Sequence, residues 1–94
     1  MAVSTIPNQF RLRKKSVNTG SFNIGANSGV NKTVPFTVDS GYSFLAIMRV
    51  NTTSATIVVG NTYVDGNNFN CTVMNYDSIA KNITVYIDYL ISKG

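Results

Sequence analysis

The chain lacks His, Glu and Trp, and it has a single cysteine, Cys71. Without His, the Ser-His-Asp and Cys-His nucleophile systems and every imidazole metal site are excluded. One cysteine also excludes an intrachain disulfide and a cysteine-cluster zinc site. The only side-chain carboxylates are those of Asp39, Asp65, Asp77 and Asp88. We therefore expect no enzymatic activity, no catalytic residue, no cofactor and no metal.

One catalytic alternative stays open, because two carboxylates facing each other at a defined separation can support glycoside hydrolysis. Asp39 and Asp65 are each followed within two residues by Gly, which is typical of turn residues. Asp77 and Asp88 are the pair that remains. This alternative requires the fold to bring the two side chains together.

Charge is also scarce, since charged residues make up 13% of the chain, about half of the usual share. Neutral polar residues take their place: the 94 residues include 12 Asn, 9 Ser and 10 Thr. Asn favours turns and tolerates positive φ, whereas Thr suits the exposed face of a strand. This composition favours short strands and tight turns over helices.

The net charge of +4 comes from one cluster of Arg11, Arg13, Lys14 and Lys15, because the other four cations balance the four acids. Proteins that bind nucleic acid usually spread basic residues over a face and interleave them with stacking aromatics. A local cluster favours a solvated basic edge strand, which also opposes edge-to-edge aggregation. We expect no nucleic-acid partner, and a small basic nucleic-acid-binding barrel is kept as an alternative.

Targeting signals are not evident. No apolar run reaches the ~18–20 residues of a membrane span, and residues 1–7 are too mixed for a signal peptide. We expect assembly in the cytoplasm of the producing cell, which a lone cysteine also suits. Four N-x-[ST] sequences occur, at Asn31, Asn51, Asn70 and Asn82. In a chain this rich in Asn and Thr they are interpreted as chance.

Strand signals recur at the spacing typical of a β-sandwich or barrel. The β-prone segments are Phe10–Val17, Ser21–Ile24, Val30–Val38, Tyr42–Asn51, Thr56–Val59, Thr62–Val64, Phe69–Met74 and Ile83–Ile91. Pro35 marks the third segment as an edge or bulged strand. The sequence therefore predicts an all-β, antiparallel, jelly-roll-like sandwich of seven or eight strands. Residues 1–18 are expected to form a basic arm or first strand, and residues 19–94 the sandwich.

The segment Tyr42–Asn51 is the most apolar of the chain. Strict alternation would place Phe44, Ala46, Met48 and Val50 on one face and Leu45, Ile47 and Arg49 on the other. Both faces are apolar up to Arg49, so we expect burial on both sides. A small sandwich cannot cover both faces, and self-association would bury the second. A homo-oligomer with Leu45, Ile47 and Arg49 at its interface is predicted.

Candidate ligand-binding residues lie near the turns. Tyr63 and Tyr76 flank Asn-containing turns, where an exposed tyrosine ring can stack on a sugar and amides can hydrogen-bond its hydroxyls. Asn67, Asn68 and Asp77 lie in or beside these turns. These five residues form the predicted ligand-binding set.

Four segments of the second half of the chain form a familiar pattern. They are Ser40–Ile47, Val64–Val73, Met74–Ser78 and Asn82–Ile91. In this order they resemble the C-terminal head, or tip, domains of phage and prophage tail-fibre and baseplate receptor-binding proteins. Asp88 departs from the pattern, because it interrupts the Val/Thr-rich final strand.

The resemblance implies a non-enzymatic virion structural protein of the phage tail that binds a host-surface polysaccharide or protein. It also implies a homotrimer with other tail proteins as partners, with receptor contacts in the turns and residues 1–18 against the shaft or a neighbouring chain. Three weak sites on one tip would raise avidity. A stand-alone carbohydrate-binding module is the second alternative.

Overall fold

The computed structural model describes residues 11–93, which form eight strands and no helix. The strands are β1 (Leu12–Asn18), β2 (Phe22–Ile24), β3 (Ser28–Pro35), β4 (Tyr42–Thr52), β5 (Ile57–Asp65), β6 (Asn68–Asn75), β7 (Lys81–Ile83) and β8 (Val85–Lys93). The predicted all-β antiparallel sandwich is confirmed. Residues 1–10 of the predicted arm lie outside the described residues. Within residues 11–93 there is no helix long and apolar enough to cross a membrane.

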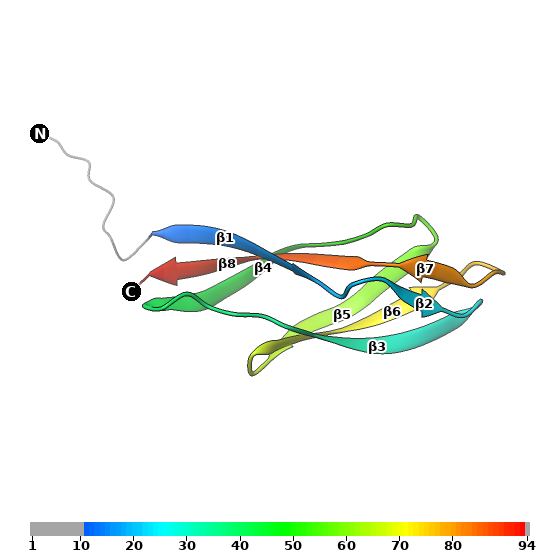
Figure 1. Cartoon of the computed structure of the whole chain (residues 1–94), viewed down its shortest axis with the longest axis horizontal. Helices are drawn as coiled ribbons and strands as arrows, with labels where there is room; N and C mark the ends of the chain where they lie inside the picture. The colour runs from blue at the N-terminus through cyan, green and yellow to red at the C-terminus, as the bar shows by residue number, and fades with distance from the viewer. Residues whose placement is uncertain (1–10, 94) are drawn as a thin grey trace, which may run out of the picture.

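The strands form two layers, and each layer has one central strand. In the first layer β8 lies between β1 and β4, and in the second β6 lies between β3 and β5. The short pair β2–β7 continues the β1–β8 ladder past Thr84, where Thr19 N donates to Val85 O at 3.0 Å. The molecule is elongated, with β1, β4 and β8 toward one end and β2 and β7 toward the other (Figure 1). β1 pairs with β8 along its whole length, so it belongs to the sheet.

An aromatic cluster joins the two central strands. Phe69 of β6 and Tyr89 of β8 are fully buried, with ring centroids 5.2 Å apart in an edge-to-face arrangement. Phe36 stacks on Phe69 at 4.1 Å and meets Tyr89 edge-on at 5.2 Å. Such pairs add about 0.5–1.5 kcal/mol each beyond the burial of their area. The buried Tyr89 hydroxyl donates to Thr37 O at 2.7 Å, so its polar atom is satisfied.

The alternation predicted for residues 83–91 is confirmed. The inward side chains are Ile83, Val85, Ile87, Tyr89 and Ile91, none of them more than 2% exposed. The pattern spans two strands, because Thr84 separates β7 from β8. Pro35 is the last residue of β3, which is an edge strand as predicted, so its missing N–H costs no ladder bond in the interior of the sheet.

Strand β4 departs from the predicted alternation. Its pairing with β8 shifts twice, between Phe44 and Ala46 and between Ile47 and Arg49, and each shift adds one residue to β4. Four of its side chains pack against the core: Tyr42, Phe44, Ile47 and Val50. Leu45 and Met48 are 51% and 52% exposed. The predicted faces are thus wrong, since Ile47 faces the core and does not share a face with Leu45 and Arg49.

A single copy of the chain leaves the second apolar face of β4 uncovered, as expected for a small sandwich. Its outward side chains Leu45, Ala46 and Met48 are exposed. Only the inward face of the strand packs against the core. The second apolar face is therefore uncovered by residues 11–93.

The Tyr89 hydroxyl gives a direct test of the core. We expect Tyr89→Phe to lower the free energy of unfolding by about 1 kcal/mol, because the part-buried hydrogen bond from the Tyr89 hydroxyl to the Thr37 carbonyl is lost. Tyr86→Phe makes the same chemical change on the exposed face of the same strand and should stay within about 0.5 kcal/mol of the parent. Urea denaturation measures both. Equal effects of the two substitutions would contradict this account.

Candidate functional site

Strand β6 presents one face to the core and the other to solvent. Its inward side chains are Phe69, Cys71, Val73 and Asn75, none of them more than 2% exposed. Its outward side chains are Asn68, Asn70, Thr72 and Met74, which are half-buried. Because β6 is the central strand, these outward residues form the middle of the outer face of the β3–β6–β5 sheet.

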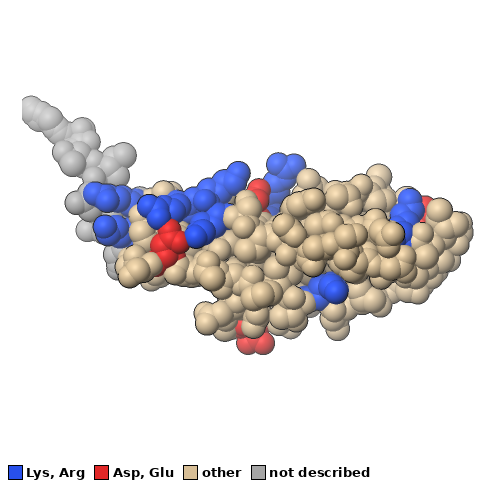
Figure 2. Space-filling view, viewed as in Figure 1, with Lys and Arg blue, Asp and Glu red and all other residues tan. Residues whose placement is uncertain are grey.

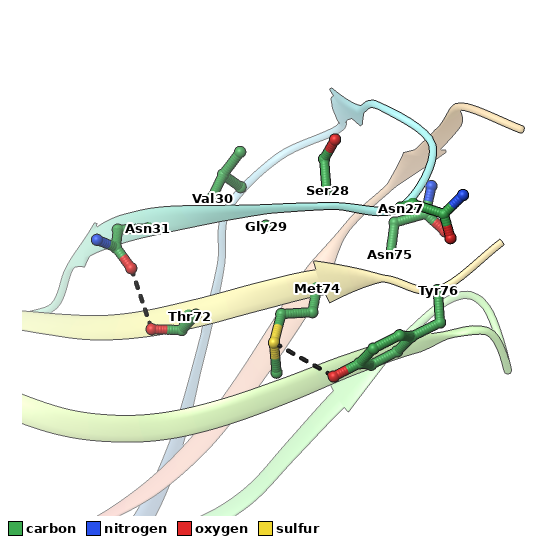
Figure 3. A pocket seen from close by; sticks show the side chains of 9 residues that line it. All are labelled: Asn27, Ser28, Gly29, Val30, Asn31, Thr72, Met74, Asn75 and Tyr76. Carbon is green, nitrogen blue, oxygen red and sulfur yellow. Dashed lines mark hydrogen bonds between the residues drawn. The ribbon is translucent and has the colours of Figure 1, made fainter. Parts of the chain in front are cut away.

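Two of the N-x-T sequences meet on this face. Asn31 of β3 lies opposite Thr72 of β6, and Thr33 lies opposite Asn70. Thr72 Oγ1 donates to Asn31 Oδ1 at 3.0 Å (Figure 3), and Thr33 Oγ1 donates to Asn70 Oδ1 at 2.7 Å. We call these four residues the Asn–Thr grid. Neither Asn Nδ2 hydrogen-bonds to another described residue, so both amide NH₂ groups are left to bind a ligand.

Two hollows lie along this face, and together they form what we call the groove. The larger has a volume of ≈ 610 Å³ and the smaller ≈ 400 Å³, and they share Asn31 and Thr72. The larger hollow is lined by Asn27, Ser28, Gly29, Val30, Asn31, Thr72, Met74, Asn75 and Tyr76 (Figure 3). The smaller hollow is lined by Asn31, Lys32, Asn61, Tyr63, Asn70, Cys71 and Thr72. The larger hollow is thus uncharged, and the register places the two end to end along β6.

Two glycines flank Met74 on the outer face of the sheet. Gly29 of β3 lies opposite Met74 and lines the larger hollow, and Gly60 of β5 lies opposite Thr72. A Cβ on Gly29 would lie 3.4 Å from Met74 Cγ, and a Cβ on Gly60 would lie 3.9 Å from Met74 Cε. Larger side chains at these two positions would crowd Met74, which is half-buried.

Tyr76 follows the last residue of β6 and closes one end of the groove. Its side chain is among the most exposed large hydrophobics of the described chain, at 64%. Its hydroxyl donates to Met74 Sδ at 3.5 Å, so the ring lies back toward the groove floor (Figure 3). Its backbone N donates to Thr56 O at 3.2 Å, which ties the turn to the β4–β5 connection.

The buried Asn75 fixes the position of Tyr76. Its Nδ2 donates to the carbonyls of Ile24, Gly25 and Ile79 at 3.3, 3.1 and 3.0 Å. Its Oδ1 accepts from Asp77 N at 2.9 Å. One side chain thereby satisfies backbone groups from two segments, and removing it would leave them unpaired. Tyr76 therefore lies between Asn75 and Asp77, which are hydrogen-bonded to each other.

Tyr63 reaches the groove because β5 contains a bulge. Gly60 pairs with Thr72 and Tyr63 pairs with Asn70, so two residues of β5 oppose one of β6. Strict alternation from Gly60 would turn Tyr63 toward the core, and the extra residue turns it outward. Asn61 sits in the bulge with φ of 49°, a conformation that Asn tolerates. Tyr63 is 49% exposed as a result.

The structure separates the five predicted ligand-binding residues into two groups. Tyr63, Asn68 and Tyr76 lie on or beside the outer face of the β3–β6–β5 sheet. Asn67 lies in the β5–β6 turn, where its carbonyl accepts from Phe36 N at 2.9 Å. Asp77 pairs with Lys81 at 3.2 Å, and the hydrogen bond from Lys81 lowers the pKa of Asp77. Asn67 and Asp77 therefore hold turns in place.

Sequence reasoning missed the centre of the site, which consists of the Asn–Thr grid and Met74. A signal for it was present, because two residues two positions apart on a strand share a face. Two N-x-T sequences in neighbouring antiparallel strands can therefore pair as a grid. Cys71 points the opposite way, and its burial raises the pKa of the thiol, so it acts as a core residue.

The possible pair of catalytic carboxylates does not form. Asp77 contacts Lys81 at the start of β7, whereas Asp88 lies on β8, accepts from Ser16 Oγ at 2.6 Å and lies 3.9 Å from Lys14. The seven residues from Lys81 to Asp88 span on the order of 20 Å of strand. Glycosidase carboxylates lie within about 10 Å of each other. Among residues 11–93 no group of three His, Cys, Asp or Glu side chains could hold a metal ion.

Most of the basic cluster is paired within the chain. Lys15 Nζ lies 2.6 Å from Asp39, and Arg13 pairs with the same carboxylate while its guanidinium lies 4.7 Å from the centre of the Tyr42 ring. Figure 2 shows these cations gathered over the β1 end of the molecule, with acidic atoms among them. Hydrogen bonds from Lys15 and then Arg13 lower the pKa of Asp39. The cluster is part of an edge-strand ion-pair network.

Comparison with known proteins gives no relative: no family model, no curated protein and no solved structure matches the chain. The geometry of the groove is therefore the main basis for a function.

The Asp39 ion pairs predict a pH dependence of stability. The unfolded carboxyl binds a proton near pH ~4, whereas the folded one binds it at lower pH, so the stabilisation is complete above about pH 4 and is lost as the pH falls through the folded pKa. We expect Asp39→Asn to lower the thermal midpoint at pH 7 and to cost less near pH ~2–3.

Asp65→Asn is the matched control for this test, since Asp65 lies at the end of β5 with no ion pair among residues 11–93. Thermal melts followed by circular dichroism over the pH range measure both variants. A pH-independent difference between Asp39→Asn and the parent would contradict the ion-pair account.

Proposed function

We propose that the protein is a non-enzymatic, saccharide-binding domain of the phage tail-fibre-tip type, acting as a homotrimer on a host cell surface. The observation that carries the proposal is the groove. It combines two exposed tyrosine rings with amides and hydroxyls, and its larger hollow is uncharged. Concave sites of a few hundred Å³ with a few convergent polar groups are typical of ligand-binding sites.

The chemistry of the groove suits sugars. A sugar hydroxyl both donates and accepts a hydrogen bond, and an Asn amide offers both functions. The Asn–Thr grid supplies two such amides with free NH₂ groups. Tyr63 and Tyr76 add ring faces for the apolar side of a sugar ring, and each carries a hydroxyl that tolerates water. These features support binding without chemistry.

The opposite layer supports self-association. The outer face of the β1–β8–β4 sheet carries four exposed large hydrophobic side chains: Leu12, Leu45, Met48 and Tyr86. Arg49 and Asp88 lie among them. Apolar patches of this kind mark interaction surfaces. A trimer formed through this face would leave all three grooves free, and their combined avidity would suit attachment of a virion tail.

A stand-alone carbohydrate-binding module is the second candidate. One observation favours it: the core is closed within a single chain, with Phe69 and Tyr89 fully buried. Such a chain can fold without a partner. The mass in solution distinguishes the two candidates.

Tyr76 provides the test of saccharide binding. The full chain is screened on an array of bacterial surface polysaccharides, and we expect Tyr76→Ala to weaken the best signal about tenfold, the upper end for one aromatic contact. Ile79→Ala removes an exposed apolar side chain outside both the groove and the self-association face and serves as the control. Absence of any saccharide signal, or equal loss in both variants, would refute the proposed site.

Met48 and Leu45 provide the test of assembly. Light scattering after size exclusion should give about three times the chain mass of 10.2 kDa. The double change Leu45→Asp and Met48→Asp places charge on the apolar face, so we expect it to give the monomer mass. Ile79→Asp, at a 61% exposed side chain near β7, is the control and should leave the trimer intact. A monomeric parent would favour the stand-alone module.

A further inference from the structure

We infer that the groove binds an extended, uncharged saccharide chain along β6, with Tyr76 and Tyr63 stacking on different sugars of that chain. The inference rests on the saccharide binding proposed above and goes further, because it specifies the shape and charge of the ligand. Four observations carry it: the spacing of the rings, the repeat of the grid, the position of the cation and the pairing of β6 on both sides.

The two tyrosines are too far apart to hold one sugar. Tyr63 pairs with Asn70, which lies four residues before Met74 and six before Tyr76. At ~3.3 Å per residue the two rings are separated by roughly 13–20 Å along β6, depending on how far Tyr76 leans toward Met74. That distance exceeds one sugar ring. A ligand that touches both tyrosines is therefore a chain.

The Asn–Thr grid fills the space between the rings with a repeat of its own. The Asn31–Thr72 and Thr33–Asn70 pairs are successive rungs on the outer face, ~7 Å apart along the strand. Each rung leaves an amide NH₂ group for a ligand. Regularly spaced hydrogen-bonding groups suit a ligand that repeats along its length.

Among residues 11–93, Lys32 is the only cation that lines the groove, and it is turned away from it. Lys32 borders the smaller hollow, but its Nζ lies 4.3 Å from the centre of the Phe22 ring on β2, in the other layer. Within this described part of the chain, the groove therefore presents no cation to pair with a carboxylate or sulfate. Asp65, opposite Asn68 at the Tyr63 end, would repel an anionic chain. The charges favour an uncharged polymer.

A peptide fits this face less well than a sugar chain. Extended peptides bind through main-chain hydrogen bonds at a free sheet edge. The centre of the groove is a strand paired on both sides, so it offers side chains only. Stacking rings and amides on a sheet face match a saccharide instead.

The test uses graded oligosaccharides, from disaccharide to octasaccharide, of dextran, cellulose and rhamnan, titrated calorimetrically into the full chain. We expect the affinity for the series that binds to rise about tenfold with length, as the second ring is engaged. Tyr63→Ala should remove this gain with length, whereas Tyr63→Phe should keep it. Oligogalacturonates of equal length should bind more weakly than the uncharged series.

The outcomes separate the two proposals. Affinity independent of length, a gain that survives in Tyr63→Ala, or equal binding of oligogalacturonates would overturn this inference while saccharide binding stands. If no polysaccharide on the array binds the full chain, the proposed function itself is overturned.

Discussion

Strand β6 contributes side chains to both the core and the groove. The alternation of its side chains determines which of the two each residue joins. Burial of Phe69, Val73 and Asn75 fixes which face of β6 points inward, and the alternate residues then have to point outward. A slip of one residue would bring Asn70 and Thr72 into the core and expose Phe69. The register that closes the aromatic cluster is therefore the same register that assembles the Asn–Thr grid.

The bulges in β4 and β5 determine which side chains each layer exposes. In β5 an extra residue near Asn61 turns Tyr63 from the core to the groove. In β4 two extra residues turn Ile47 toward the core and Met48 outward. Both edge strands lie beside a regular central strand, so the local change does not disturb the core. The bulges thus expose Tyr63 on one layer and Met48 on the other.

Much of the fold could be predicted from the sequence, because period-two alternation is strong where one face is buried. The pattern of residues 83–91 and the edge position of Pro35 were predicted on that basis. The faces of β4 were not, since nothing in Tyr42–Thr52 shows where an extra residue enters the ladder. For the site, exposed tyrosines were predictable from nearby turns. The grid was predictable only in part: the two N-x-T sequences are visible, but their pairing depends on the register between β3 and β6, which the sequence of neither strand contains.

The scarcity of charge also determines which ligands the groove can distinguish. Neutral hydrogen bonds at a solvent-exposed face contribute about 0.5–1.5 kcal/mol each, and a stacked ring contributes a similar amount. A site made from such contacts binds each sugar weakly and gains selectivity from the number and spacing of contacts. Rigidity then matters more than strength, because loose rings would lose the spacing. The four hydrogen bonds of Asn75 beside Tyr76 and the bulge before Tyr63 supply that rigidity at the two ends of the groove.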